Sequence, residues 1–205
     1  MDGVVIVEDD EAMRDALVWL FASRNVETCA YASAEHFLAA CGADGAGCTA
    51  ACLVLDVRLS GMSGPELFRQ LRTGGFDVPV IFLTGHGDIP LAVAALKDGA
   101  FDFLEKPFDD NYLVDRALIA LEQHRRRLGE RAGAAAIETR LASLSTRERE
   151  VMDLILAGRL NKQIADDLGV SIRTVEVHRS RVFEKMGARA AVDLARLMKD
   201  YNERN

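Results

Sequence analysis

The sequence predicts two domains of different classes: an α/β domain with a flavodoxin-like, doubly wound, five-stranded parallel sheet, and then an all-α domain of four helices. Residues 1–123 alternate short β-branched runs with amphipathic stretches, a pattern typical of a parallel sheet covered by helices. Residues 141–205 contain no strand signal. The formal charge is −12 over residues 1–123 and +2 over residues 141–205, which indicates two different tasks.

Five short apolar runs are the predicted strands. They are Val4–Val7, Thr28–Tyr31, Leu53–Leu55, Val78–Leu83 and Asp102–Leu104. Residues 41–51 are small and rich in glycine, so they are predicted as a loop.

Amphipathic stretches between these runs are the predicted helices. Ser63 and Glu66 have the spacing of a capping box with Pro65 in the first turn, and Gly99 ends the fourth helix. The predicted helices are Glu11–Ser23, Ala34–Ala40, residues 63–72, Ile89–Asp98 and a helix from about Asp109 past Leu121.

The last third of the chain is predicted as a connection and a helical domain. Residues 124–140 are charged and then rich in alanine and glycine, so we expect a helical extension that fades into a linker. Gly129 and Gly133 each weaken a helix by about 1 kcal/mol relative to alanine. Four short helices are expected at about 146–157, 161–168, 172–186 and 190–200.

Polar residues follow the predicted strands. Asp9 and Asp10 follow the first strand, Asp56 ends the third, Thr84 follows the fourth and Lys106 follows the fifth. In an open parallel sheet, functional residues gather outside the carboxyl ends of the strands. We therefore expect these five side chains to share one site.

These residue types suit phosphoryl chemistry. Three converging carboxylates repel one another and favour a hard cation, and Mg²⁺ accepts a few carboxylates while it keeps waters and phosphate oxygens as its other ligands. A carboxylate such as that of Asp56 can attack a phosphoryl group and become an aspartyl phosphate. Lys106 could pair with the added charge, and the Thr84 hydroxyl could donate a hydrogen bond to it.

Residues 1–123 resemble a response-regulator receiver domain. The resemblance implies that Asp56 is the phosphoacceptor, Thr84 the switch hydroxyl and Phe103 the aromatic switch residue. It also implies that Asp10, Asp56 and the backbone carbonyl of Arg58 bind Mg²⁺, that Asp9 helps through water, and that the Lys106–Pro107 peptide is cis. The stretches Thr84–Asp88 and Phe103–Phe108 are similar to the FixJ branch. Ser60 is a departure, since relatives usually carry proline there.

The C-terminal residues have the signals of a helix-turn-helix. Ser145 and Glu148 form a capping box, Gly169–Ser171 is a tight turn, and residues 172–186 carry four Lys and Arg against two Glu. Residues 143–200 resemble the LuxR-type helix-turn-helix of the NarL/FixJ regulators. The resemblance implies that Glu176, Val177 and Ser180 face base edges. Basic and polar residues nearby are candidates for the remaining DNA contacts: Lys162, Arg173, Thr174, His178, Arg181 and Lys185.

The expected function is that of a two-component response regulator that activates transcription. We expect no catalytic role beyond its own phosphorylation and dephosphorylation. A sensor histidine kinase would phosphorylate Asp56, the chain would dimerise, and the dimer would bind double-stranded promoter DNA and engage RNA polymerase. The resemblance implies a dimer face at residues 89–98 and the last strand, with Val93 and Lys97 as contacts. No apolar run approaches the roughly 18 residues that span a bilayer, and the cysteine usage favours the cytoplasm.

Two alternatives remain open. In one, the first domain is a dimerisation scaffold for a DNA-binding protein that works without phosphorylation, although Asp10, Asp56 and Lys106 are all present. In the other, the chain is a phosphotransfer or phosphatase enzyme whose C-terminal domain binds other proteins. Phosphatases that use an aspartate nucleophile need a second Asp two residues later, where this chain has Arg58.

Overall fold

The computed structural model describes all residues except 1–2, 43–44, 46, 48–49, 86–88 and 204–205. The chain divides into two compact units, residues 1–127 and residues 128–205. The division falls inside one long helix, and each unit has its own core.

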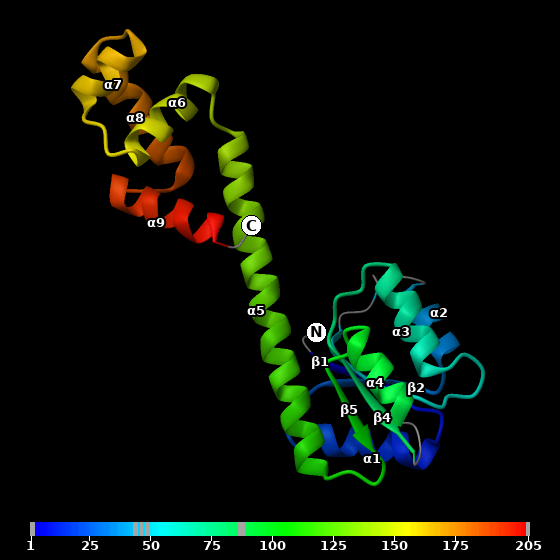
Figure 1. Ribbon diagram of the computed structural model, residues 1–205. Helices are drawn as coiled ribbons and strands as arrows, with labels where there is room; N and C mark the ends of the chain where they lie inside the picture. Colours follow the sequence, from blue (N-terminus) through cyan, green and yellow to red (C-terminus); the bar gives the residue numbers. More distant parts are fainter. Residues whose placement is uncertain (1–2, 43–44, 46, 48–49, 86–88, 204–205) are drawn as a thin grey trace. The chain divides into compact units, whose positions relative to one another are not determined.

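The first unit is built on a five-stranded sheet in which all neighbouring strands are parallel. Its strands are β1 (Gly3–Val7), β2 (Thr28–Tyr31), β3 (Ala50–Asp56), β4 (Val80–Thr84) and β5 (Asp102–Glu105). Their order is β2-β1-β3-β4-β5, so β1, β3 and β4 lie in the interior and β2 and β5 form the edges. Figure 1 shows this sheet within the first unit. The predicted doubly wound parallel sheet is confirmed.

Helices cover both faces of this sheet. They are α1 (Glu11–Ala22), α2 (Ala34–Cys41), α3 (Gly64–Thr73), α4 (Ile89–Lys97) and α5 (Asp110–Ala142). Successive strand residues point to opposite faces, so Val4 and Ile6 pack with α1 and α5, whereas Val5 and Val7 pack with α2, α3 and α4. The interior strands are apolar on both faces because both faces are buried.

Two strand boundaries differ from the prediction. β3 begins at Ala50, inside the segment predicted as a loop, and Ala50 and Cys52 pair with β1. Small residues have little strand propensity, but here they are buried and pair with β1. β4 begins at Val80 and not at Val78, since Pro79 has no N–H to donate to the sheet.

The expectation that residues 124–140 fade into a linker is wrong. α5 continues through Gly129 and Gly133 to Ala142. Its first turns bury Leu113 and Val114 in the core of the first unit, and Ile137 packs against the core of the second. Packing at both ends and the good helix formers between them outweigh the cost of the two glycines, about 1 kcal/mol each.

The second unit contains, in addition to the end of α5, four helices among its described residues, as predicted. They are α6 (Thr146–Leu156), α7 (Asn161–Leu168), α8 (Ile172–Met186) and α9 (Ala191–Asn202). Their core is formed by apolar residues such as Val151, Ile164, Val175 and Leu194, each of which is fully buried.

Candidate functional site

The carboxyl ends of the strands bring together residues that lie far apart in the sequence. Glu8 follows β1, Asp56 ends β3 and Thr84 ends β4, while Lys106 follows β5. Val7 pairs with Leu55 in the sheet, so the ends of these two strands lie at the same edge.

An acidic cluster lies at this edge. Glu8, Asp9 and Asp56 each offer a carboxylate oxygen, and these oxygens lie within 4.8 Å of one another. Glu8 is 1% exposed and Asp56 is 7% exposed, whereas Asp9 is half-buried. A set of three carboxylates that is open on one side fits a hard divalent cation that keeps some of its waters.

Lys106 is the counter-charge of the cluster. Its Nζ lies 2.7 Å from Oε2 of Glu8 and 3.3 Å from Oδ2 of Asp56. Burial alone lowers the pKa of Lys106, but the hydrogen bond to Glu8 and the charge of Asp56 outweigh it and raise the pKa above its usual value. Lys106 therefore stays charged beside Asp56. The Lys106–Pro107 peptide is cis, as expected.

The acidic pair of the cluster is Glu8 and Asp9, which corrects the assignment of Asp10. The Asp10 side chain caps α1, with Oδ1 accepting a hydrogen bond from the Met13 N–H at 2.8 Å, and Asp10 is exposed. Burial raises the pKa of Glu8, in keeping with its place at the end of a buried strand. The missed signal was that Asp10 directly precedes a helix, where Asp is a preferred cap.

Thr84 and Phe103 lie on neighbouring strands. Thr84 is 1% exposed, and its hydroxyl donates to the Gly85 carbonyl at 3.1 Å. Phe103 pairs with Phe82 in the sheet and packs partly buried against the core beneath α2, α3 and α4. Residues 86–88, part of the stretch similar to FixJ, lie outside the described residues.

Of the other predicted site residues, Arg58 lies beside the cluster, whereas Val93 and Lys97 lie apart from it on α4. The Arg58 N–H lies 3.4 Å from Oδ1 of Asp56, so the backbone at Arg58 passes next to the phosphoacceptor candidate. Val93 is 46% exposed, and Lys97 is also exposed on the same helix, α4. Leu91 and Leu96 of α4 are also exposed, at 44% and 46%.

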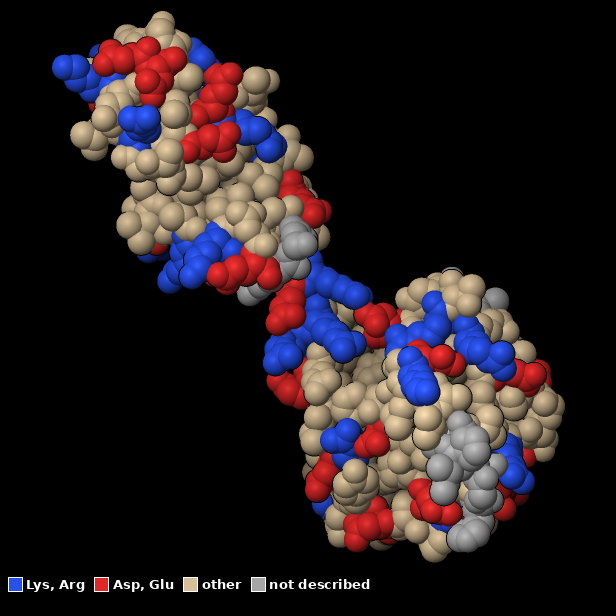
Figure 2. Space-filling model, viewed as in Figure 1, with Lys and Arg blue, Asp and Glu red and all other residues tan. Residues whose placement is uncertain are grey.

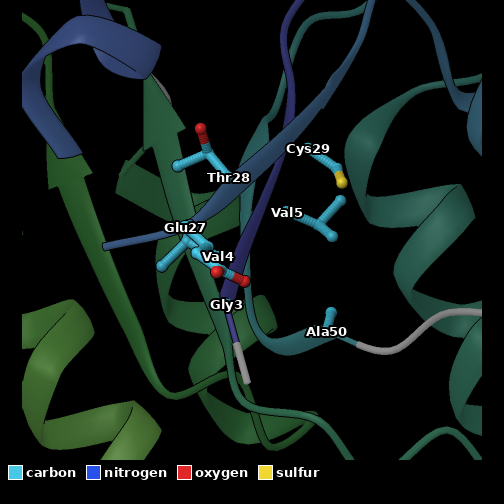
Figure 3. A pocket seen from close by; sticks show the side chains of 7 residues that line it. All are labelled: Gly3, Val4, Val5, Glu27, Thr28, Cys29 and Ala50. Carbon is cyan, nitrogen blue, oxygen red and sulfur yellow. The ribbon is translucent and has the colours of Figure 1, made fainter. Parts of the chain in front are cut away.

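A hollow at the other end of the sheet is too small for a substrate. It is lined by the first residues of β1, β2 and β3, including Gly3, Cys29 and Ala50 (Figure 3), and its volume is about 20 Å³. That is room for about one water molecule.

The second unit contains a helix-turn-helix. Gly169 ends α7 with a φ of +64°, and the Ser171 side chain caps α8 by accepting from the Thr174 N–H. A left-handed residue at this position favours glycine. Ala165 of α7 and Val175 of α8 are buried, and these two helices pack together.

The outward face of α8 carries most of the predicted DNA contacts. Arg173, Glu176, Val177, Ser180 and Arg181 are exposed, as is Lys162 at the start of α7. Thr174 and His178 are half-buried at the edge of this face. Basic and acidic side chains are interspersed on the visible side of this unit (Figure 2), so there the charge alone does not outline a DNA surface.

Lys185, which is also predicted to contact DNA, pairs with a buried carboxylate of the same unit. Its Nζ lies 2.6 Å from Oε2 of Glu148 and 2.9 Å from the Ser143 carbonyl. Glu148 is 3% exposed and also accepts a hydrogen bond from the Ser145 N–H. The bond from Lys185, followed by that from Ser145, lowers the pKa of Glu148 to about 2. Lys185 therefore holds α8 to the start of α6.

No described helix is both long enough and apolar enough to cross a bilayer.

Comparisons with known proteins agree with both units. Residues 4–118 match the model of the response regulator receiver domain, and residues 142–198 match that of the bacterial regulatory proteins of the luxR family. The chain is 55% identical to the C4-dicarboxylate transport transcriptional regulatory protein DctR of Rhodobacter capsulatus, over 95% of this chain and 98% of DctR. It is 41% identical to the transcriptional regulatory protein FixJ of Bradyrhizobium diazoefficiens, over 95% and 93% of the two chains.

Solved structures of response regulators are also similar to this chain over almost its whole length. The response regulator StyR is 37% identical with a TM-score of 0.87, over 97% of this chain and 98% of StyR. Full-length FixJ from B. japonicum is 40% identical with a TM-score of 0.61, over 99% and 98%. A receiver domain implies a sensor kinase as partner, and a LuxR-type domain implies DNA binding. The chain therefore belongs to the NarL/FixJ family of response regulators, transcription regulators in which a receiver domain precedes a LuxR-type DNA-binding domain.

Proposed function

We propose that Asp56 accepts a phosphoryl group from a phosphohistidine of a sensor histidine kinase. An Asp56 carboxylate oxygen forms the new P–O bond, the P–N bond breaks, and the imidazole nitrogen keeps the electron pair and takes up a proton. The observation that carries this proposal is the ion pair between Lys106 and the buried Asp56, at 3.3 Å. Lys106 is placed to offset the charge that phosphorylation adds.

We further propose that the acidic cluster binds Mg²⁺ through Glu8, Asp9 and Asp56, with the backbone carbonyl of Arg58 as an additional ligand. Bound there, Mg²⁺ would neutralise charge on the phosphoryl oxygens. The support is the donor set itself, since its carboxylate oxygens lie within 4.8 Å of one another. Hydrolysis of the aspartyl phosphate at the same site would reset the protein.

Phosphorylation would then shift an existing equilibrium of the receiver domain. The added charge draws Lys106 and the Thr84 hydroxyl toward Asp56, and Phe103 moves inward on the neighbouring strand. The exposed apolar side chains of α4, with Val93 and Lys97 among the contacts, become the face of a homodimer. The dimer places two copies of α8 on DNA half-sites about one helical turn apart, where it recruits RNA polymerase.

The exposed residues of α8 support two kinds of contact with promoter DNA, to phosphates and to base edges. Arg173, Arg181 and Lys162 would contact phosphates, together with Thr174 and His178, and these contacts position the protein. Glu176, Val177 and Ser180 would read base edges, because they lie on the same exposed face.

A target can also be proposed. The 55% identity to DctR over almost the whole chain supports control of genes for C4-dicarboxylate transport. Deletion of the gene should then abolish growth on succinate or malate as sole carbon source and leave growth on glucose unchanged. Normal growth of the deletion strain on both acids would refute this target.

The test of the phosphorylation site uses the full chain, acetyl phosphate and Mg²⁺, with the intact mass as the readout. Wild type should gain one phosphoryl group and Asp56→Asn none. Asp10→Asn is the matched control, since it removes an acidic group two residues beyond Glu8 but keeps a residue that can cap α1. Labelling of Asp56→Asn to the wild-type level would refute the phosphorylation site. If phosphorylated and unphosphorylated wild type bind DNA with equal affinity, the proposed control of DNA binding by phosphorylation is refuted.

A further inference from the structure

Ser60 binds the acidic cluster with two donors. Its backbone N–H donates to Oδ2 of Asp9 at 2.9 Å, and its hydroxyl donates to the same oxygen at 2.5 Å. Asp9 follows β1, whereas Ser60 lies in the loop after β3. The two bonds therefore tie together the two loops that supply the carboxylates of the cluster.

A second carboxylate holds the far side of the same loop. Oε1 of Glu35, in the first turn of α2, accepts a hydrogen bond from the Met62 N–H at 2.9 Å. Gly61 lies between the two contacts with a φ of +90°, a conformation that favours glycine. The loop after Asp56 is thus fixed on both sides, and Ser60 is the contact that faces the cluster.

We propose that Ser60 is a positioning residue for the divalent cation, because its two hydrogen bonds to Oδ2 hold the Asp9 carboxylate in place at the cluster. This inference rests on the proposed metal site. A carboxylate in a half-buried loop loses affinity for a cation when its side chain can rotate away, and partners of metal ligands commonly change metal affinity by about 10- to 100-fold.

The choice of residue at position 60 gives a graded test. Alanine keeps the N–H and loses the hydroxyl, threonine keeps both donors, and proline loses both. Ser63→Ala is the matched control, since Ser63 lies in the same loop but its hydroxyl bonds to Glu66, 2.7 Å away, and not to the cluster.

The experiment measures Mg²⁺ binding to the full-length variants by titration calorimetry, with circular dichroism to confirm folding. Ser60→Ala should bind Mg²⁺ about tenfold more weakly than wild type, and Ser60→Pro should bind at least as weakly as Ser60→Ala. Ser60→Thr and Ser63→Ala should bind like wild type. In phosphorylation with acetyl phosphate, Ser60→Ala should need correspondingly more Mg²⁺ for half-maximal rate but reach the wild-type rate at saturation.

The outcomes separate the two proposals. Failure of wild type to bind Mg²⁺ would refute the metal site itself. Binding by wild type with an unchanged affinity of Ser60→Ala would refute only the role of Ser60, as would an equal loss in Ser60→Thr. A lower rate of Ser60→Ala at saturating Mg²⁺ with an unchanged half-maximal concentration would also refute it.

Discussion

Replacing Lys185 by methionine tests whether this lysine stabilises the DNA-binding unit or contacts DNA. Lys185 pairs with Glu148 at 2.6 Å, and the Glu148 side chain is only 4% exposed. Methionine keeps most of the length of the lysine side chain but leaves the Glu148 carboxylate without its cation. An uncompensated buried charge is destabilising, so the variant should unfold more easily than wild type.

The pKa of Glu148 gives the magnitude. Lowering of this pKa from 4.5 to about 2 corresponds to a contribution of about 3 kcal/mol to the free energy of unfolding at neutral pH. Part of it belongs to the Ser145 N–H, which remains in the variant, and Lys185 is 36% exposed to screening solvent. We therefore expect a loss of about 1–2 kcal/mol for Lys185→Met.

The sign of the pH dependence follows from the lowered pKa. The carboxylate form is favoured in the folded state, so the stabilisation is complete above pH 4.5 and is lost as the pH falls toward 2. The difference between wild type and Lys185→Met should shrink over the same range.

The assay is urea unfolding of the full chain, followed by the helix signal in circular dichroism. Lys199→Met is the matched control, because Lys199 pairs with Glu203 in the same unit at 3.6 Å but both side chains are largely exposed. Exposed pairs of this kind contribute little. A variant Lys185→Met that is as stable as wild type, but binds DNA more weakly with a flatter salt dependence, would refute the structural role and restore the DNA contact.

Three further expectations concern the other assignments. Asp10→Ala should lower the free energy of unfolding of the receiver domain by about 1 kcal/mol through loss of the cap and leave Mg²⁺ affinity near that of wild type; a large loss of affinity would return Asp10 to the metal site. Arg181→Ala should weaken binding to all duplex sequences and reduce the slope of log affinity against log salt concentration by about 1. Arg196→Ala on α9 should change neither the affinity nor this slope. Identical slopes for both variants would argue against a phosphate contact by Arg181. Phosphorylated wild type should sediment with a higher dimer fraction, and Val93→Glu should remain monomeric; a dimer of that variant would remove α4 from the interface.

The architecture of both units follows from the pattern of apolar residues along the chain. Buried parallel strands need continuous apolar runs, and the helices between them need one apolar face, so each leaves a recognisable pattern of apolar residues. The limits of β3 were less accessible, because Ala50 and Cys52 are small and acquire their strand conformation from pairing with β1. The continuity of α5 across Gly129 and Gly133 was also hidden, since packing at the two ends of the helix decides it.

Asp56, Thr84 and Lys106 could be placed from the sequence because each follows a recognisable strand. The tertiary structure alone decided between neighbours of the same chemical type. Three acidic residues lie between β1 and α1. Because α1 begins at Glu11, Asp10 caps the helix, whereas Glu8 and Asp9 lie in the cluster. Arg181 and Lys185 are both basic residues of α8, but Glu148 of another helix reaches only Lys185. Sequence spacing gives the type and order of the side chains, whereas their partners depend on which elements pack against them.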